Sequence, residues 1–297
     1  MTRRQFAQAC ASLPLMAAPV ARFRKGICSI IFPKEMPLEE QFRQARNAGF
    51  EGIEIPLGEV LPLDTNQEQA QRLGDAARRA GIELISFWAS APLSPNPLNH
   101  PDPAVRAKGV EALRKAVRLA SWAGCGALLI VPGRLGSGPK FQIGYQDSWD
   151  RISAEMKKVV PDAEKARVYL APENVWNKFL VSPLEMRAFV DQFNSPWVGA
   201  YFDIGNILQY GYPQDWILTL GSRIKRVHAK DYKLSTRAEQ GRFVNLLEGD
   251  VDWKEVMAAL VKVGYHGFIS PEYSYRPDDP EQLRRISAAL DKILALA

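Results

Sequence analysis

Four ionisable residues stand at or near the carboxyl ends of four apolar segments in the second half of the chain. They are Glu173 after VYLAP, Asp203 in AYFD, His228 in RVHA and Glu272 after FISP. Three carboxylates held close together repel one another, and their burial is costly unless a cation compensates the charge. One imidazole and three carboxylates suit a divalent ion (Mn²⁺, Mg²⁺, Co²⁺ or Zn²⁺) with positions left for substrate oxygens.

Taken singly, each of these residues is more simply explained as a cap or an ion pair at the end of a strand. Their succession on four consecutive strands favours a shared site, provided that the fold brings the four strand ends together. The elements that carry them therefore decide between the two interpretations.

The chain alternates short apolar runs with amphipathic helical segments. The clearest helix is 105–124, where Val110, Leu113, Val117 and Ala120 recur at helical spacing. Glycines mark the expected helix ends at positions 49, 81, 124 and 264. The expected strands are 26–32, 52–56, 83–90, 127–133, 168–174, 198–205, 224–231 and 266–273.

Eight strands, each followed by a helix, fit either a closed (β/α)₈ barrel or an open doubly wound sheet. A doubly wound nucleotide-binding sheet should have a glycine-rich turn after its first strand, and here that strand runs into FPKEMP. We therefore predict a single (β/α)₈ TIM barrel over 22–297, with the metal site at the carboxyl-terminal rim of strands five to eight. The long loops 90–103 and 132–146 follow strands and belong to the same catalytic face.

Composition sets further bounds. The chain has 297 residues and a formal net charge of +5, without a dense Lys/Arg run, so the charge gives no argument for nucleic-acid binding. Three cysteines (Cys10, Cys28 and Cys125) provide no disulfide framework.

The first 21 residues differ in kind from the rest. Arg3 and Arg4 precede a short, weakly apolar stretch and small residues near Ala18 and Ala21, and this segment contains no acidic residue. That order is typical of a twin-arginine export signal, so we expect a periplasmic or exported protein. The alternative is a frayed basic N-terminus on a cytoplasmic protein. No segment is apolar and long enough to span a membrane.

The motifs LAPENVWN, YFDIGN and RVHAKD, together with Glu272, resemble the xylose-isomerase-like barrel superfamily. That group contains sugar isomerases, ketose 3-epimerases, hydroxypyruvate isomerases, inosose dehydratases and an apurinic endonuclease branch. The resemblance covers essentially the whole chain after the signal. It implies one divalent metal ion held by Glu173, Asp203, His228 and Glu272, with Glu173 and Glu272 as the acid/base pair. Related barrels often pair, which leaves a homodimer open.

The chain departs from one subgroup of that family at Asn206. Many ketose epimerases have a His at this position, whereas Asn can bond a sugar hydroxyl but cannot titrate. The endonuclease branch binds several zinc ions through many histidines, and this chain has only His100, His228 and His266. The resemblance therefore points to a small sugar-like substrate and away from nucleic acid.

Several further residues are candidates to line the substrate pocket. Strand alternation places Lys230 on the side of His228, with an ion pair to Asp231 or Glu272 as the alternative. Asn174 and Asn177 are expected to orient Glu173. Each of the others has a plain alternative, either core packing or contact with solvent. The candidates for substrate binding are Asn206, Lys230, Glu54, Trp88, Trp176 and His100.

The motifs and the resemblance leave three possible functions. The first is a metal-dependent isomerase or epimerase of a small sugar or keto sugar that acts through an enediolate. The second is a lyase, dehydratase or hydratase that uses the same site on a keto-inositol or keto-glycoside. The third is a sugar-binding barrel without catalysis.

Overall fold

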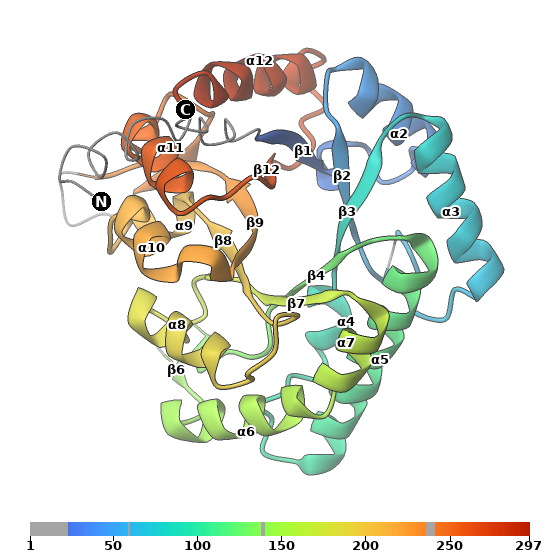
Figure 1. The fold of residues 1–297 in the computed structure, drawn as a ribbon, viewed down its shortest axis with the longest axis vertical. Helices are drawn as coiled ribbons and strands as arrows, with labels where there is room; N and C mark the ends of the chain where they lie inside the picture. Colours follow the sequence, from blue (N-terminus) through green and yellow to red (C-terminus); the bar gives the residue numbers. More distant parts are fainter. Residues whose placement is uncertain (1–22, 59, 138–139, 236–240) are drawn as a thin grey trace, which may run out of the picture.

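The computed structural model describes residues 23–58, 60–137, 140–235 and 241–297. Within them, eight parallel strands form one central sheet that curls into a barrel, and the helices surround it as an outer ring (Figure 1). The predicted (β/α)₈ barrel is thereby confirmed. The predicted export signal at 1–21 lies outside the described residues.

The strands of the barrel follow the alternation of the sequence closely. Their bounds are β1 (Arg24–Cys28), β2 (Gly52–Pro56), β3 (Glu83–Trp88), β4 (Ala127–Ile130), β7 (Tyr169–Pro172), β8 (Ala200–Asp203), β9 (Ile224–Ala229) and β12 (Phe268–Pro271). The first expected strand, 26–32, was wrong beyond Cys28, because the chain turns there into the 3-10 helix η1 (Ser29–Ile31). Two short hairpins in the rim loops were not predicted. They are β5 (Gly136–Ser137) with β6 (Lys140–Phe141), and β10 (Asp231–Lys233) with β11 (Arg242–Val244).

Helices connect the strands on the outside of the barrel. Their bounds are α2 (Leu38–Asn47), α3 (Gln67–Arg79), α4 (Ser90–Leu93), α5 (Pro103–Ala123), α6 (Tyr145–Lys157), α7 (Val160–Ala166), α8 (Pro183–Asp191), α9 (Gly205–Leu208), α10 (Pro213–Leu220), η2 (Gly221–Arg223), α11 (Trp253–Lys262) and α12 (Gln282–Leu294). The expected glycine stops are confirmed: Gly124 ends α5 with φ of 73°, and Gly49, Gly81 and Gly264 also have positive φ. None of the described helices is long and apolar enough to cross a membrane.

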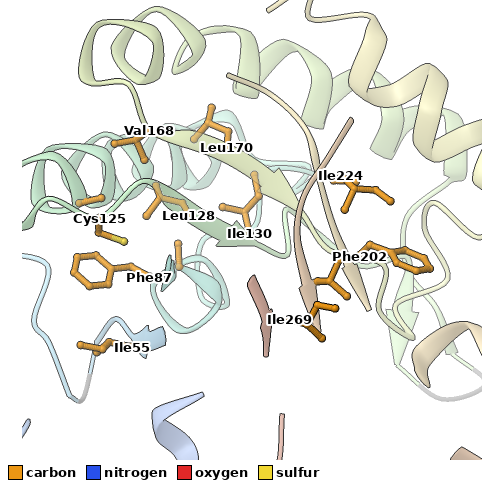
Figure 2. Close-up of a cluster of buried hydrophobic side chains, with 14 of the residues drawn as sticks. Ile55, Phe87, Cys125, Leu128, Ile130, Val168, Leu170, Phe202, Ile224 and Ile269 are labelled. Atoms are coloured by element: carbon orange, nitrogen blue, oxygen red, sulfur yellow. The ribbon is translucent and has the colours of Figure 1, made fainter. Parts of the chain in front are cut away.

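Alternation along the strands separates two environments. Side chains such as Ile55, Leu128, Leu170 and Phe202 point outward and pack beneath the helices as the main hydrophobic core (Figure 2). Their neighbours in the sequence point into the barrel, where Leu129, Ala171 and Tyr201 form a separate small cluster. This parity explains why an ionisable residue can follow an apolar strand: it belongs to the inner face.

The barrel closes weakly between β7 and β8. The other seven neighbouring strand pairs form parallel ladders, whereas these two strands are joined only by isolated bridges, Leu170 to Val198 and Glu173 to Tyr201. Glu173 is thus placed directly at the seam. Side chains must hold the two strand ends together there, and they come from the candidate site.

Candidate metal centre

The four predicted ligands meet at the carboxyl-terminal rim. One donor atom from each of Glu173, Asp203, His228 and Glu272 lies within 4.8 Å of all the others. His228 Nδ1 is 2.9 Å from Glu173 Oε1, 3.2 Å from Glu272 Oε2 and 3.9 Å from Asp203 Oδ2. Asp203 and His228 are completely buried, while the side chain of Glu272 is 21% exposed. The site therefore opens on the side of Glu272.

Strand register explains this convergence. Asp203 pairs with His228 across β8 and β9, and Ser270, two residues before Glu272, pairs with His228 across β9 and β12. Glu173 joins from β7 through its bridge to Tyr201. Parallel strands end on the same side, so four neighbouring strands deliver four inward-facing side chains to one point.

The donor set fits a divalent cation. Asp203 Oδ2 is buried and has no hydrogen-bond partner of suitable geometry within the described part of the chain, although Lys230 Nζ approaches it to 3.0 Å. Three carboxylate oxygens and one imidazole nitrogen at this spacing match the ligands of Mn²⁺, Mg²⁺, Co²⁺ or Zn²⁺. The fit concerns the class of ion and does not distinguish among these metals.

The second nitrogen of His228 is held by Glu54 on β2. His228 Nε2 lies 3.0 Å from Glu54 Oε2, and the same oxygen accepts hydrogen bonds from Ser86 Oγ at 3.0 Å and Trp88 Nε1 at 2.7 Å. Because a carboxylate only accepts, Nε2 carries the proton and Nδ1 is left to face the other ligands. Glu54 was a candidate to line the substrate pocket, but the structure buries it completely, bonded to His228.

Electrostatics reinforce this arrangement. Burial acts to raise the pKa of Glu54, but the contact with His228 outweighs burial and lowers it. For His228, burial opposes the charged form, whereas Cys28, Glu54 and further acidic groups around the ring raise its pKa well above the usual range. Without a metal, this negative environment favours a proton on Nδ1 as well, and a bound cation would take the place of that proton.

Replacing Glu54 with Gln should weaken metal binding by about 10- to 100-fold, the usual cost of losing a carboxylate that orients a ligating His. Gln keeps the shape but removes the charge that fixes the tautomer of His228. Titration calorimetry with Mn²⁺ measures the effect, and Glu83→Gln on an exposed position of β3 is the matched control. Equal Mn²⁺ affinity of the two variants would refute the positioning role of Glu54.

Two asparagines fasten the seam between β7 and β8. Asn174 Nδ2 donates to the carbonyl oxygen of Asp203 and Asn174 Oδ1 accepts from the amide of Asp203, both at 2.8 Å. Asn206 Nδ2 donates back to the carbonyl oxygen of Asn174 at 2.9 Å, and the amide of Asn206 donates to Asp203 Oδ1 at 2.7 Å. These bonds replace the missing ladder and fix the backbone of Asp203, so our expectation that Asn174 orients Glu173 was wrong.

Asn174→Ala should lower the free energy of unfolding by about 2–4 kcal/mol, because two buried backbone groups of Asp203 lose their partners. Urea denaturation followed by circular dichroism measures the loss. Asn47→Ala, at an exposed position near the end of α2, should change stability by about 0.5 kcal/mol or less. A loss below about 1 kcal/mol in the Asn174 variant would contradict the proposed role at the seam.

Lys230 lies directly beside the four ligands. Its Nζ is 2.6 Å from Glu272 Oε2 and 3.0 Å from Asp203 Oδ2. The alternative partner that we considered, Asp231, instead accepts bonds from the Leu247 and Gly249 amides and supports the loop after β11. Lys230 thus adds one positive charge at the open side of the site.

The two glutamates of the site have different proton affinities. Burial raises the pKa of Glu173 to about 7. Burial also acts on Glu272, but His228 and Lys230 outweigh it and lower the pKa of Glu272 to about 2. Two carboxyl groups whose environments separate their pKa values are the usual arrangement for acid/base chemistry.

The remaining candidates from the sequence differ in what they contact. Trp88 contacts the His228 ring edge-on at 5.4 Å between centroids and bonds Glu54, so it supports the site from inside. Trp176 is 43% exposed and stacks on Phe243 of β11.

Two other candidates lie outside the ligand cluster. His100 accepts a hydrogen bond at Nδ1 from the Asp102 amide, and the residue lines a separate pocket with Arg134. Asn177 bonds the Gly133 carbonyl and the Phe179 amide rather than Glu173, so our expectation that it orients Glu173 was wrong.

Sequence reasoning missed several contributors inside the barrel. Ser86 bonds both Glu54 and the hydroxyl of Tyr201, and Tyr201 packs against the His228 ring at 4.6 Å between centroids. Cys28 Sγ lies 3.5 Å from His228 Nε2. Period-2 alternation marks Ser86 and Tyr201 as inward-facing, and this was the available signal.

Comparison with known proteins agrees with the fold. A family model described as "Xylose isomerase-like TIM barrel" matches residues 42–293. The L-ribulose-5-phosphate 3-epimerase UlaE of Salmonella paratyphi C (strain RKS4594) is 30% identical over 252 residues, covering 80% of this chain and 84% of that protein. UlaE of Escherichia coli O1:K1 is 29% identical over 262 residues, covering 84% and 88% of the two chains.

Solved structures of ketose epimerases have a fold similar to that of this chain. A D-psicose 3-epimerase from Clostridium cellulolyticum H10, crystallised with D-tagatose, has a TM-score of 0.77 at 21% identity, covering 92% of this chain and 99% of that chain. An L-ribulose 3-epimerase has a TM-score of 0.75 at 22% identity and covers 92% and 95% of the two chains.

Proposed function

The chain belongs to the xylose isomerase-like TIM barrel family, and the proteins similar to it include sugar epimerases. We therefore propose that it is a divalent-metal-dependent isomerase or epimerase of a small keto sugar. The observation that carries this proposal is the convergence of Glu173, Asp203, His228 and Glu272 on one rim point. If these residues were separate strand caps or ion pairs, four strands would not need to bring them to one point.

These four residues would hold one divalent ion, whose chemistry when bound is to polarise the substrate carbonyl and acidify the neighbouring C–H. Glu173 Oε1 and Glu272 Oε2 lie 2.9 Å and 3.2 Å from His228 Nδ1, and the two glutamates would serve as the acid/base pair. One carboxylate removes the proton beside the carbonyl, which gives an enediolate, and the other returns a proton. Return to the opposite face of the same carbon is epimerisation. Return to the adjacent carbon, with a hydroxyl proton moving to the former carbonyl oxygen, is isomerisation.

The surrounding side chains position the substrate. Lys230 Nζ, at the open side beside Glu272, binds an oxygen of the sugar. Trp176 is exposed at the rim and offers an aromatic face to the C–H-rich side of a sugar ring. Asn206 is 5% exposed, and the placement of its amide at the seam fits a role in holding Asp203 as well as in contacting a hydroxyl.

One observation favours a second candidate function, a lyase. The ammonium group of Lys230 lies 2.6 Å from Glu272 Oε2, so the site holds a cation able to donate a hydrogen bond to a departing β-hydroxyl. The same enediolate would then lose water instead of taking a proton back on carbon.

Product analysis separates the two functions. We would incubate the Mn²⁺-loaded protein with ketoses, keto-inositols and 3-keto-glycosides and follow products by NMR. The isomerase proposal predicts a changed stereocentre or a moved carbonyl with the mass conserved. A product lighter by one water on every converted substrate would replace the proposal with the lyase.

Export by the twin-arginine route remains a prediction for residues 1–21. It would place the enzyme where unphosphorylated sugars are the available substrates. Fractionation of cells that produce the full chain, compared with an Arg3→Lys, Arg4→Lys variant, would test the route through the location of the protein.

A further inference from the structure

A second pocket opens on the same rim as the metal centre. It has a volume of about 570 Å³ and lies among the loops that follow β1, β2, β3 and β12. Its walls are mainly apolar and include Ile30, Phe32, Pro33, Leu57, Val60 and Tyr275. The volume falls within the roughly 300–1,000 Å³ typical of pockets that hold a small organic ligand.

Three residues that line the pocket follow, at strand ends, residues in or beside the metal centre. Ser29 in its wall follows Cys28, whose Sγ lies 3.5 Å from His228 Nε2. Pro56 comes two residues after Glu54, and Ser274 comes two residues after Glu272. None of the four predicted metal ligands lines it, so this space is separate from the metal centre itself.

The chemistry of the walls indicates an uncharged occupant. Lys34 is the one charged residue among the described residues that line the pocket. Recognition of a phosphate ordinarily uses several donors at once, such as an Arg fork or a helix N-terminus. Aromatic and proline side chains instead favour the flat face of an apolar ring.

One residue that lines the pocket, Gln41, has a buried side-chain oxygen without a hydrogen-bond partner in the described part of the chain. Gln41 on α2 is 3% exposed, and its Nε2 donates to the carbonyl oxygen of Met36 at 2.8 Å. Because a carbonyl only accepts, this bond fixes the orientation of the amide. Gln41 Oε1 then has no hydrogen-bond partner among the residues that the structure describes. A ligand that carries a donor would satisfy this oxygen.

We propose that this pocket is a subsite for an aryl substituent of the sugar, with a hydroxyl on the aryl ring donating to Gln41 Oε1. The inference rests on the proposed function and narrows its substrate class to aryl-substituted sugars. The sugar ring would lie at the metal centre and the aryl ring against Phe32, Pro33 and Tyr275.

Binding to the Mn²⁺-loaded protein tests this subsite without requiring turnover. The probes are methyl, phenyl and 4-hydroxyphenyl β-D-glucopyranoside, measured by titration calorimetry. The phenyl glycoside should bind more than about 10-fold tighter than the methyl glycoside, because a ring is buried. The 4-hydroxyl should add about 5-fold, the effect of one net hydrogen bond.

Two variants separate the walls from the acceptor. Gln41→Leu should remove the 4-hydroxyl advantage and keep the phenyl advantage, whereas Gln44→Leu on the same helix should change neither. Ala91→Trp, at an exposed position of the pocket wall, should fill the pocket and remove the aryl preference without affecting the methyl glycoside. Ala107→Trp, exposed on α5, is its control.

Equal affinity for the three glycosides would overturn the subsite, as would an aryl preference that survives Ala91→Trp. The proposed function fails in a different way. Turnover of keto sugars without an aryl preference would leave the function standing and remove the subsite. An aryl preference without turnover of any keto sugar would leave the subsite standing and remove the proposed function.

Discussion

Glu173→Gln and Glu272→Gln are each expected to lower the turnover of a keto sugar by at least about 10²- to 10⁴-fold, the usual contribution of a general acid or base. Gln keeps the volume of the side chain and one oxygen that can face the metal, but it cannot take up a proton. Both residues should be needed, because proton removal and proton return use different carboxyl groups. The measurement is kcat by NMR or polarimetry on whichever keto sugar the wild type converts.

The control for these variants is Glu248→Gln, an exposed residue after β11 whose substitution should leave turnover unchanged. Far-ultraviolet circular dichroism and thermal unfolding should show that all three variants fold. If both site variants kept full turnover of a confirmed substrate, the glutamate pair would not be the acid/base machinery.

Asp203→Ala and His228→Ala are expected to reduce divalent-metal affinity by more than about 100-fold, because changes outside the coordination sphere already cost 10- to 100-fold. Each variant removes one of four donors that lie within 4.8 Å of one another. Elemental analysis of protein purified without chelators should find close to one divalent ion per wild-type chain and almost none in either variant.

Asp215→Ala and His266→Ala, both at exposed positions, provide controls of the same residue types. They should retain the metal content of the wild type. Unchanged metal content in both Asp203→Ala and His228→Ala would mean that the metal binds elsewhere or not at all, and the site would need another explanation.

The sequence allowed the barrel to be predicted because its elements are marked locally. Alternation and helical spacing located all eight strands, and glycines such as Gly124 marked the helix ends. The meeting of Asp203 and His228 could also be foreseen, since parallel neighbouring strands end on the same side. Strand ends were less certain: Cys28 ends β1 where the apolar run continues into a 3-10 helix.

Other features depend on contacts across the barrel that local patterns do not encode. Glu54 was predicted only as a residue lining the substrate pocket, yet it bonds His228, which is 174 residues later in the sequence. Asn174 bonds the backbone of Asp203 where β7 and β8 lack a ladder, and this pairing depends on which strands meet at the seam of the barrel. The β10–β11 hairpin was missed because its strands are only three residues long.

The most direct test of the central claim, that these four side chains form the metal site on which sugar isomerisation depends, is deuterium exchange in D₂O. A keto sugar would be incubated with chelated protein that is then titrated with Mn²⁺, and deuterium at the carbon beside the carbonyl would be followed by NMR. We predict no exchange without metal, a plateau at one equivalent of Mn²⁺, and no recovery in Asp203→Ala. Exchange that proceeds at the full rate in the chelated protein, or in Asp203→Ala, would contradict the account.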